Sequence, residues 1–195
     1  MSDVAPEVVK SRRTLILIAA MFFLPIAAAF ILYYGVGWRP GGSNIHGELL
    51  QPIKQLPEAA AALLAGEGPK DTNWALVYVG DGSCDADCQQ ALVFARQTRL
   101  SLGQEMTRVN RGFVATANCC NLDYIDKEQK GTKVFDVSDS SAMRELRSVL
   151  PPGELAHWLF VVDPLGNIVM RYDVRKEPRG LLDDLKKLLK LSHIG

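Results

Sequence analysis

A long apolar run lies near the N-terminus of the chain. No charged side chain occurs from Thr14 to Trp38, and residues 15–34 read LILIAAMFFLPIAAAFILYY. In a helix that rises about 1.5 Å per residue, about 20 residues cross a hydrocarbon layer about 30 Å thick. Pro25 is compatible with such a span, because neighbouring groups in lipid satisfy the carbonyl that a proline frees. The pattern therefore predicts one membrane-spanning helix over residues 14–36.

A cleavable signal peptide is the alternative to an anchor, because Ala27, Ala28 and Ala29 place small residues behind an apolar stretch. The apolar run continues, however, over residues 30–34 (FILYY). It therefore extends beyond the apolar core of a usual signal peptide, which is about 7 to 15 residues long. We favour an uncleaved anchor.

The charges that flank the anchor predict its orientation. Lys10, Arg12 and Arg13 precede it, whereas only Arg39 follows it closely. Because positive charge is retained on the cytoplasmic side of a membrane, residues 1–13 are expected to form a cytoplasmic tail. The C-terminal bulk of the chain is then periplasmic, and the protein spans the inner (plasma) membrane once.

Glycine and proline interrupt any regular pattern over residues 37–57, which we interpret as a linker. Residues 58–195 then form a single domain. The whole chain of 195 residues equals about one and a third average domains, which excludes a multidomain machine. A composition of 48% hydrophobic and 23% charged residues excludes an intrinsically disordered chain, and a net charge of zero offers no bulk attraction to nucleic acid.

Apolar runs of strand length alternate with helical patterns along this domain. The expected elements are a short helix at 57–65, a strand at 74–79, a helix from 84 to about 108, a strand at 112–117, a helix at 140–150, a hairpin of strands 157–162 and 167–172, and a closing helix around 181–189. A strand, a helix and a second strand form a βαβ unit with parallel strands. The order βαβ, helix, ββ, helix predicts an α/β domain with a thioredoxin-like fold.

The four cysteines carry most of the candidate chemistry. Cys84 and Cys88 open the long helical pattern and form a Cys-x-x-x-Cys motif. Side chains four residues apart on a helix have Cβ atoms about 5 to 6 Å apart, so the two sulfurs can bind one soft metal ion or close a disulfide after some unwinding. Cys119 and Cys120 follow the next strand. Because parallel strands end at one edge of a sheet, all four cysteines are expected there.

Structural interpretations of the cysteines stay open beside the functional one. Cys84 and Cys88 are also compatible with a structural disulfide in an oxidising compartment. Cys119 and Cys120 are compatible with small, partly buried residues at a strand end or with a vicinal disulfide.

Three aspartates flank the first cysteine pair. A carboxylate about 6 Å from a thiolate repels it by about 3 kcal/mol at an effective dielectric near 20, before screening. A helix N-terminus favours the thiolate by only about 0.3 to 1 kcal/mol. Asp81, Asp85 and Asp87 therefore favour a site that takes up a cation, and a thiolate pair prefers Cu(I) or Zn(II). Helix capping is the alternative role for these aspartates.

His157 follows the cysteines later in the chain and adds a third candidate ligand to their motif. The strand, the loop with Cys84 and Cys88, and His157 ahead of the run DPLG resemble the Sco/SenC family of membrane-anchored, thioredoxin-like copper chaperones. The runs YVGDGSCDADC, RQTRLSLG, PPG, DPLGN and SHIG are similar to a group of small single-span proteins associated with cytochrome oxidase assembly in proteobacteria. In Sco proteins the ligand histidine lies about two residues further ahead of the hairpin turn, and strand alternation keeps that side chain on the same face.

The resemblance implies a copper-binding and thiol-redox assembly factor for cytochrome c oxidase. Cys84 and Cys88 are then both the metal ligands and the redox pair, and His157 completes the copper site. The expected partners are the membrane and a cytochrome oxidase subunit or another copper-assembly protein, with no nucleic acid. His46 and His193 are expected to be solvated.

Two further hypotheses stay open beside the copper-binding one. The first is an enzyme, a periplasmic thiol-disulfide oxidoreductase that retains no metal. The second is a non-catalytic scaffold that docks an oxidase subunit.

Overall fold

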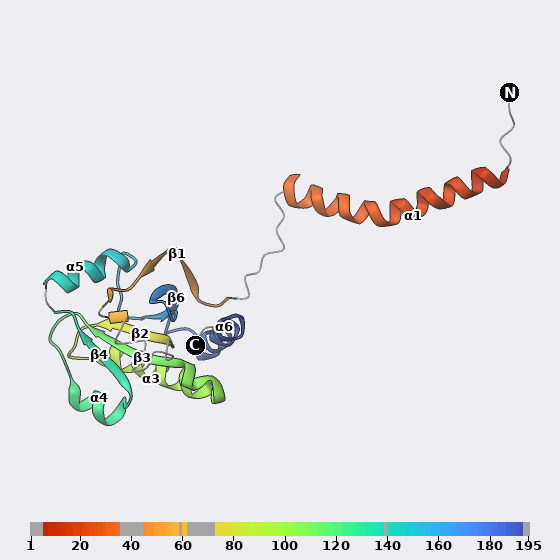
Figure 1. Cartoon of the computed structure of the whole chain (residues 1–195). Helices are drawn as coiled ribbons and strands as arrows, with labels where there is room; N and C mark the ends of the chain where they lie inside the picture. The colour runs from red at the N-terminus through yellow and green to blue at the C-terminus, as the bar shows by residue number, and fades with distance from the viewer. Residues whose placement is uncertain (1–5, 36–44, 59, 62–72, 139, 193–195) are drawn as a thin grey trace. The chain divides into compact units, whose positions relative to one another are not determined.

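The computed structural model describes residues 6–35, 45–58, 60–61, 73–138 and 140–192, and the chain divides into two compact units, Met1–Ser43 and Asn44–Gly195 (Figure 1). The first unit contains α1 (Pro6–Phe30), which continues into a π-helical turn, η1 (Ile31–Gly35). The helical segment Arg12–Gly35 is long and apolar enough to cross a membrane. The helix expected over residues 14–36 is therefore present as a candidate membrane span.

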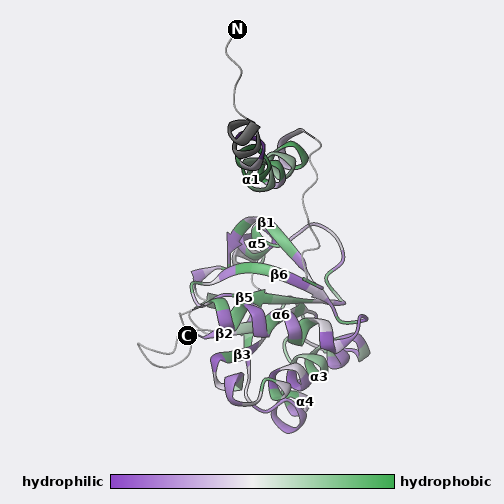
Figure 2. Cartoon of the chain, turned by 90° about the vertical axis from the view of Figure 1, so that its right-hand side faces the viewer, coloured by the Kyte–Doolittle hydropathy of each residue, from purple (hydrophilic) through white to green (hydrophobic). Residues whose placement is uncertain are grey.

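The second unit is built on a mixed sheet. In its described part, six strands lie in the order β1-β6-β5-β2-β3-β4, and Figure 2 shows β1, β6, β5, β2 and β3 following one another in this order. The strands are β1 (Glu48–Gln55), β2 (Trp74–Gly80), β3 (Val109–Ala115), β4 (Thr132–Asp136), β5 (Trp158–Val162) and β6 (Asn167–Asp173). β2, β3 and β4 pair in parallel, whereas β5 pairs antiparallel with β2 and with β6, and β6 pairs antiparallel with β1.

Helices cover both faces of this sheet. They are α3 (Ala86–Ser101), the 3-10 helix η2 (Gly103–Arg108), α4 (Leu122–Glu128), α5 (Ser140–Val149) and α6 (Pro178–Leu191). Alternate residues of β2 belong to two different buried clusters, because side chains alternate across a strand. Leu76 lies in the cluster that includes residues of α3 and α6, and Val77 lies in the cluster that includes residues of α5. The expected α/β, thioredoxin-like arrangement is confirmed.

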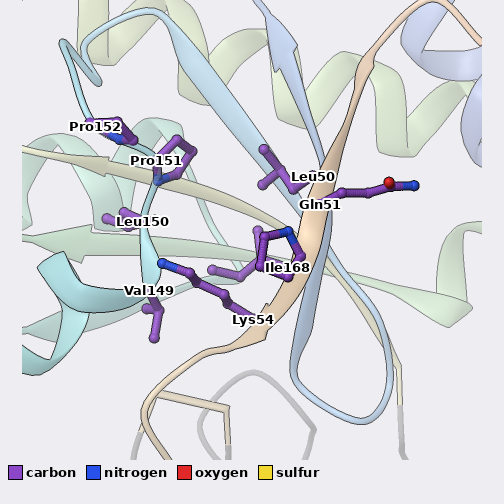
Figure 3. A pocket seen from close by; sticks show the side chains of 9 residues that line it. Leu50, Gln51, Lys54, Val149, Leu150, Pro151, Pro152 and Ile168 are labelled. Carbon is purple, nitrogen blue, oxygen red and sulfur yellow. The ribbon is translucent and has the colours of Figure 1, made fainter.

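Strand β1 was not expected, because its residues fall in the interval 37–57 that we interpreted as a linker. It pairs with β6, and its side chains are almost all exposed. Pro52 lies within it, and proline is tolerated only at the edge of a sheet. Figure 3 shows the Lys54 side chain of β1 reaching toward the end of α5, where its Nζ donates to the Ser148 carbonyl (2.7 Å). The domain therefore begins ahead of residue 58.

The helix expected from residue 84 to about 108 is two helices in the structure. α3 ends at Ser101, and Gly103 has a φ of +62°. This left-handed conformation ends a helix and costs glycine little, which explains the break before η2.

Two elements between β3 and α5 were also missed. α4 is short, and Asn121 caps its N-terminus by accepting a hydrogen bond from the Tyr124 amide (3.3 Å). β4 is the half-buried edge strand beside β3, so its sequence TKVFD lacks the continuous apolar pattern of a central strand.

The C-terminal hairpin and helix agree with expectation. Gly166 has a φ of +82°, and its amide donates to the Asp163 carbonyl (3.0 Å) in the turn between β5 and β6. Of the short helix expected at 57–65, the structure describes residues 58, 60 and 61, which are helical, and the other positions after residue 58 lie outside the described residues.

A buried carboxylate on α6 holds the segment that leads into β1. Asp184, 2% exposed, accepts hydrogen bonds from the backbone amides of His46 and Gly47, each at 2.8 Å. Its other oxygen lies 3.2 Å from Nδ1 of His46. His46 was expected to be solvated, and although its ring is half exposed, this contact makes it part of the fold. His193 lies outside the described residues.

Replacing this carboxylate should destabilise the domain. In a fragment of residues 44–195, Asp184→Ala leaves two amides without their acceptor, and we expect a loss of about 2 to 3 kcal/mol in the free energy of unfolding. Urea denaturation followed by circular dichroism measures it. The control is Asp183→Ala, which removes the neighbouring, half-buried aspartate. Equal losses in the two variants would contradict the assigned role of Asp184.

Candidate functional site

Cys84 lies in the loop that follows β2. Its φ is +52°, in the left-handed region, which costs a residue other than glycine about 1 to 3 kcal/mol. The residue after it, Asp85, is the N-cap of α3, so Cys84 precedes the helix rather than opening its first turn as expected. Cys88 lies in the first turn of α3.

Cys84 and Cys88 form a disulfide with a Cα–Cα distance of 5.0 Å. Each residue is only 1% exposed, and both belong to the buried cluster that contains Tyr78, Ala91 and Leu92. The two sulfurs therefore lie side by side, but behind the protein surface. In this state the pair is an electron acceptor, since a disulfide can be reduced to two thiols.

Two of the three aspartates beside this pair have structural roles. Asp85 accepts a hydrogen bond from the Cys88 amide (3.0 Å) and caps α3. Asp81 accepts hydrogen bonds from the Ser83 amide and from the Asn118 side chain, both at 2.8 Å, and these bonds lower the pKa of Asp81. Asp87 is exposed in the first turn of α3. Capping, the alternative role, therefore describes Asp85.

Tyr78 was missed by sequence reasoning because it belongs to an apolar strand pattern. Its hydroxyl donates to the Ala156 carbonyl (3.0 Å), which joins the end of β2 to the residue ahead of His157. Burial raises the pKa of the Tyr78 phenol, and the charges of Asp85 and Asp87 raise it further. Tyr78 is therefore neutral beside the disulfide.

His157 lies in the turn just before β5, at the edge of the sheet where β2 ends. Its ring lies beside Trp158, with 5.5 Å between the ring centroids, and its carbonyl accepts a hydrogen bond from the Val174 amide (3.0 Å). His157 also interacts electrostatically with Asp173. Hydrogen bonds from Arg175 lower the pKa of Asp173 to about 2, so this carboxylate is ionised at neutral pH.

The described residues do not assemble the expected copper site. Among them, no group of three His, Cys, Asp or Glu side chains is placed to hold a metal ion. The sulfurs of Cys84 and Cys88 are bonded to each other, and metals bind thiolates rather than a closed disulfide. Metal binding by Cys84 and Cys88 would therefore require prior reduction of the pair.

Cys119 and Cys120 form a second disulfide, between adjacent residues in the loop that follows β3. Cys119 is exposed and Cys120 is half-buried. The loop lies against the Cys84 loop, because the Gly82 amide donates to the Ala117 carbonyl (2.7 Å). The vicinal disulfide considered from the sequence is therefore the state in the structure, at the sheet edge where all four cysteines were expected.

A cleft opens at the same edge. It is lined by residues that include Gly80, Asp85, Thr116, Arg147 and Glu154, from the ends of β2 and β3, the start of α3, α5 and the segment before β5. Charges of both signs line the surface beside Asp85, so the approach to the α3 N-terminus is polar.

Comparison with known families identifies the domain. A family model described as the transmembrane-like, thioredoxin-like, C-terminal domain matches residues 74–192. The chain belongs to this family. The match runs from β2 to α6, so both cysteine pairs and His157 lie inside the family domain.

Solved Sco1 structures share the fold of this family member. The solution structure of apo Sco1 from Thermus thermophilus has a TM-score of 0.54 at 20% identity, with 74% of this chain and 96% of that chain covered. The crystal structure of yeast Sco1 and that of yeast Sco1 with copper bound have TM-scores of 0.51 and 0.50, both at 14% identity. They cover 62% and 60% of this chain, and 85% and 76% of their own. The Sco-like thioredoxin fold is confirmed, and no curated protein matches the chain.

Replacing Asp85 tests whether its hydrogen bond to the Cys88 amide stabilises the start of α3. In the fragment of residues 44–195, Asp85→Ala removes the acceptor of the Cys88 amide, and we expect a loss of about 1 kcal/mol in the free energy of unfolding. Asp87→Ala is the matched control: it removes an acidic residue from the same turn but leaves the capping hydrogen bond of Asp85 in place, and it should cost less. Denaturant titration of both oxidised variants compares them, and a larger loss in Asp87→Ala would argue against the cap.

Proposed function

We propose that this protein is a membrane-anchored thiol-disulfide redox protein of Sco type, with Cys84 and Cys88 as its redox pair. The observation that carries the proposal is the closed Cys84–Cys88 disulfide at the start of α3, where β2 ends. Thiolates are the form that leaves and attacks in exchange reactions, and the N-terminus of α3 offsets only part of the repulsion that Asp85 and Asp87 exert on them. The fold shared with Sco1 structures supports the same assignment.

The proposed reaction is a two-electron exchange. Once a local opening exposes the Cys84–Cys88 bond, which is buried in the closed structure, a thiolate of a dithiol client attacks one of its sulfurs, forms a mixed disulfide, and releases the other cysteine as a thiolate. The second client thiol then attacks the mixed disulfide. The client leaves as a disulfide, and Cys84 and Cys88 are left as two thiols. The reverse sequence reduces a client disulfide.

Copper handling is a second candidate, favoured by the Sco-like pattern of Cys84, Cys88 and His157 and by the yeast Sco1 structure that has copper bound. In the reduced state, two thiolates and an imidazole would form a soft ligand set that suits Cu(I), and the imidazole would also accept Cu(II). Copper is then cargo that the reduced pair carries to a client. Because the described residues assemble no metal site around the closed disulfide, reduction would have to precede loading.

The proposed setting is the periplasmic side of the inner membrane. The cations ahead of the apolar helix support a cytoplasmic N-terminus, which places the redox domain outside. The proposed client is a cytochrome oxidase subunit or another copper-assembly protein, whose metal-binding thiols would need to be kept reduced. A scaffold that only docks such a client is the outcome if neither exchange nor copper binding is found.

The redox proposal predicts a reversible couple at Cys84 and Cys88. Full-length protein in detergent is equilibrated in glutathione buffers of graded potential, alkylated, and analysed by peptide mass spectrometry. We expect the two cysteines to change together from alkylated to protected as the buffer becomes more oxidising, because they share one disulfide. The variant Cys119→Ser/Cys120→Ser should keep this transition. A pair that stays oxidised in every buffer would identify a structural disulfide and end the proposal.

The copper candidate predicts binding that depends on the redox state. Anaerobic titration of the reduced full-length protein with Cu(I), against a competing chelator, should give one bound ion, and the oxidised protein should bind none. Cys84→Ser should abolish binding, and His157→Ala should weaken it by about tenfold or more, because each removes a ligand. Cys119→Ser/Cys120→Ser is the control and should bind as the wild type does. Equal binding by wild type and Cys84→Ser would reject this candidate.

A further inference from the structure

The two disulfides in the described part of the chain differ in their access to solvent. Cys84 and Cys88 are each 1% exposed, so an external thiolate has no open path to either sulfur. Cys119 is exposed and Cys120 is half-buried. Thiol exchange needs direct attack on a sulfur, and its rate therefore depends on access. In the closed structure only the second disulfide meets this requirement.

The loops that carry the two disulfides form one unit. The Asn121 amide donates to the Gly82 carbonyl (2.8 Å), and the Gly82 amide donates to the Ala117 carbonyl (2.7 Å). The Asn118 side chain also donates to the carboxylate of Asp81 (2.8 Å). On one loop, these bonds involve residues on both sides of Cys119 and Cys120 in the chain. On the other loop, they involve Asp81 and Gly82, which lie just before Cys84.

The contact between these loops is as close as two backbones allow. A Cβ placed on Gly82 would lie 2.6 Å from the Cα of Cys119, so no residue other than glycine fits there without displacing a backbone. On the inner side, Cys120 packs against the buried cluster that contains Cys84 and Cys88. One member of the vicinal pair is therefore exposed, and the other contacts the buried cluster to which Cys84 and Cys88 belong.

We infer that the Cys119–Cys120 disulfide is a second redox site, through which an external dithiol protein delivers reducing equivalents to the buried Cys84–Cys88 disulfide. The inference rests on the proposed redox function and adds the route by which the buried pair is reduced. Its ligand class is a dithiol protein, because the second thiol of a dithiol resolves the mixed disulfide within the same complex, whereas a monothiol needs a second molecule to do so.

The first stage of this route reduces the exposed pair. A thiolate of the external dithiol attacks the sulfur of Cys119, the Cys119–Cys120 bond breaks, and Cys120 leaves as a thiolate. The second external thiol attacks the mixed disulfide and releases Cys119. The donor leaves as a disulfide, and Cys119 and Cys120 hold two electrons and two protons as thiols.

The second stage is internal. The thiolate of Cys120 attacks the sulfur of Cys84, a Cys84–Cys120 bond forms, the Cys84–Cys88 bond breaks, and Cys88 leaves as a thiolate. Cys119 then attacks the sulfur of Cys120, which restores the vicinal disulfide and releases Cys84. The buried pair ends as two thiols, and the vicinal pair returns to its starting state, so the electrons balance.

A kinetic experiment on the full-length protein in detergent tests the route. Oxidised protein is mixed anaerobically with reduced thioredoxin, samples are quenched in acid and alkylated, and each cysteine is followed by peptide mass spectrometry. We expect thiols of Cys119 and Cys120 to appear before those of Cys84 and Cys88. In Cys119→Ser/Cys120→Ser, reduction of the buried pair should be slower by at least about tenfold. In urea, which unfolds the wild type and the variant alike, Cys84 and Cys88 should be reduced at the same rate in the two.

A trapping experiment tests the internal stage without an external donor. The variant Cys88→Ser/Cys119→Ser retains Cys84 and Cys120, and mild oxidation with diamide should join them in a disulfide. The matched control, Cys88→Ser/Cys120→Ser, retains Cys84 and the exposed Cys119. It should form the corresponding bond at least about tenfold more slowly, because Cys119 is exposed, whereas Cys120 packs against the buried cluster that contains Cys84.

The outcomes separate this inference from the function on which it rests. If the buried pair is reduced equally fast with and without Cys119 and Cys120, the route is wrong and the redox function stands. If thioredoxin reduces neither pair in the folded wild type, both are wrong. Failure of Cys84 and Cys120 to join faster than the control pair overturns the internal stage. Ordered reduction together with preferential Cys84–Cys120 bonding supports the route.

Discussion

Parallel pairing of β2 with β3 is the constraint on which the site depends. Two parallel strands that pair from Trp74 and Val109 to Gly80 and Ala115 end at one edge of the sheet, so the loops after them must share the same space. Gly82 allows these loops to approach until their backbones touch and exchange hydrogen bonds. Both cysteine pairs lie in or beside this contact, which is why residues separated by more than thirty positions in the chain meet.

Burial of the Cys84–Cys88 disulfide has two opposed effects. Packing in the core around Tyr78 and Leu92 supports the fold and holds Cys84 in a left-handed conformation that it would otherwise avoid. The same packing shields the sulfurs from external thiols. A protein with this arrangement must either open locally or receive electrons through a neighbouring group. In the proposed route, the vicinal pair of Cys119 and Cys120 is that neighbouring group.

Two residues that interact with His157, the proposed third ligand, have other partners as well. The Arg171 guanidinium lies 4.1 Å from the centre of a Trp158 ring, and Arg175 forms an ion pair with Asp173 at 2.6 Å. Trp158 and Asp173 are therefore held in place by contacts of their own. The position of His157 at the sheet edge is set by β5.

The sequence by itself determined the elements whose patterns are locally complete. The central strands β2 and β5 and the amphipathic α6 were predictable, because burial on one or both faces dictates their residue pattern. The apolar run of α1 was predictable from its length and the hairpin turn from Gly166, which adopts a positive φ. The pairing of Cys84 with Cys88 was predictable as one of two uses of their spacing. The edge strands β1 and β4 were not, since an edge strand with exposed side chains has no apolar pattern, and only hydrogen bonds to β6 and β3 define it.

The tertiary structure alone decided the depth of the first disulfide, the exposure of the second and the contact between their loops. It also assigned Asp184 to the amides of His46 and Gly47, more than 130 residues away in the chain. Burial and long-range hydrogen bonds are properties of packed surfaces from distant segments. Spacing along the chain determines which side chains can meet, and packing determines which of them solvent can still reach.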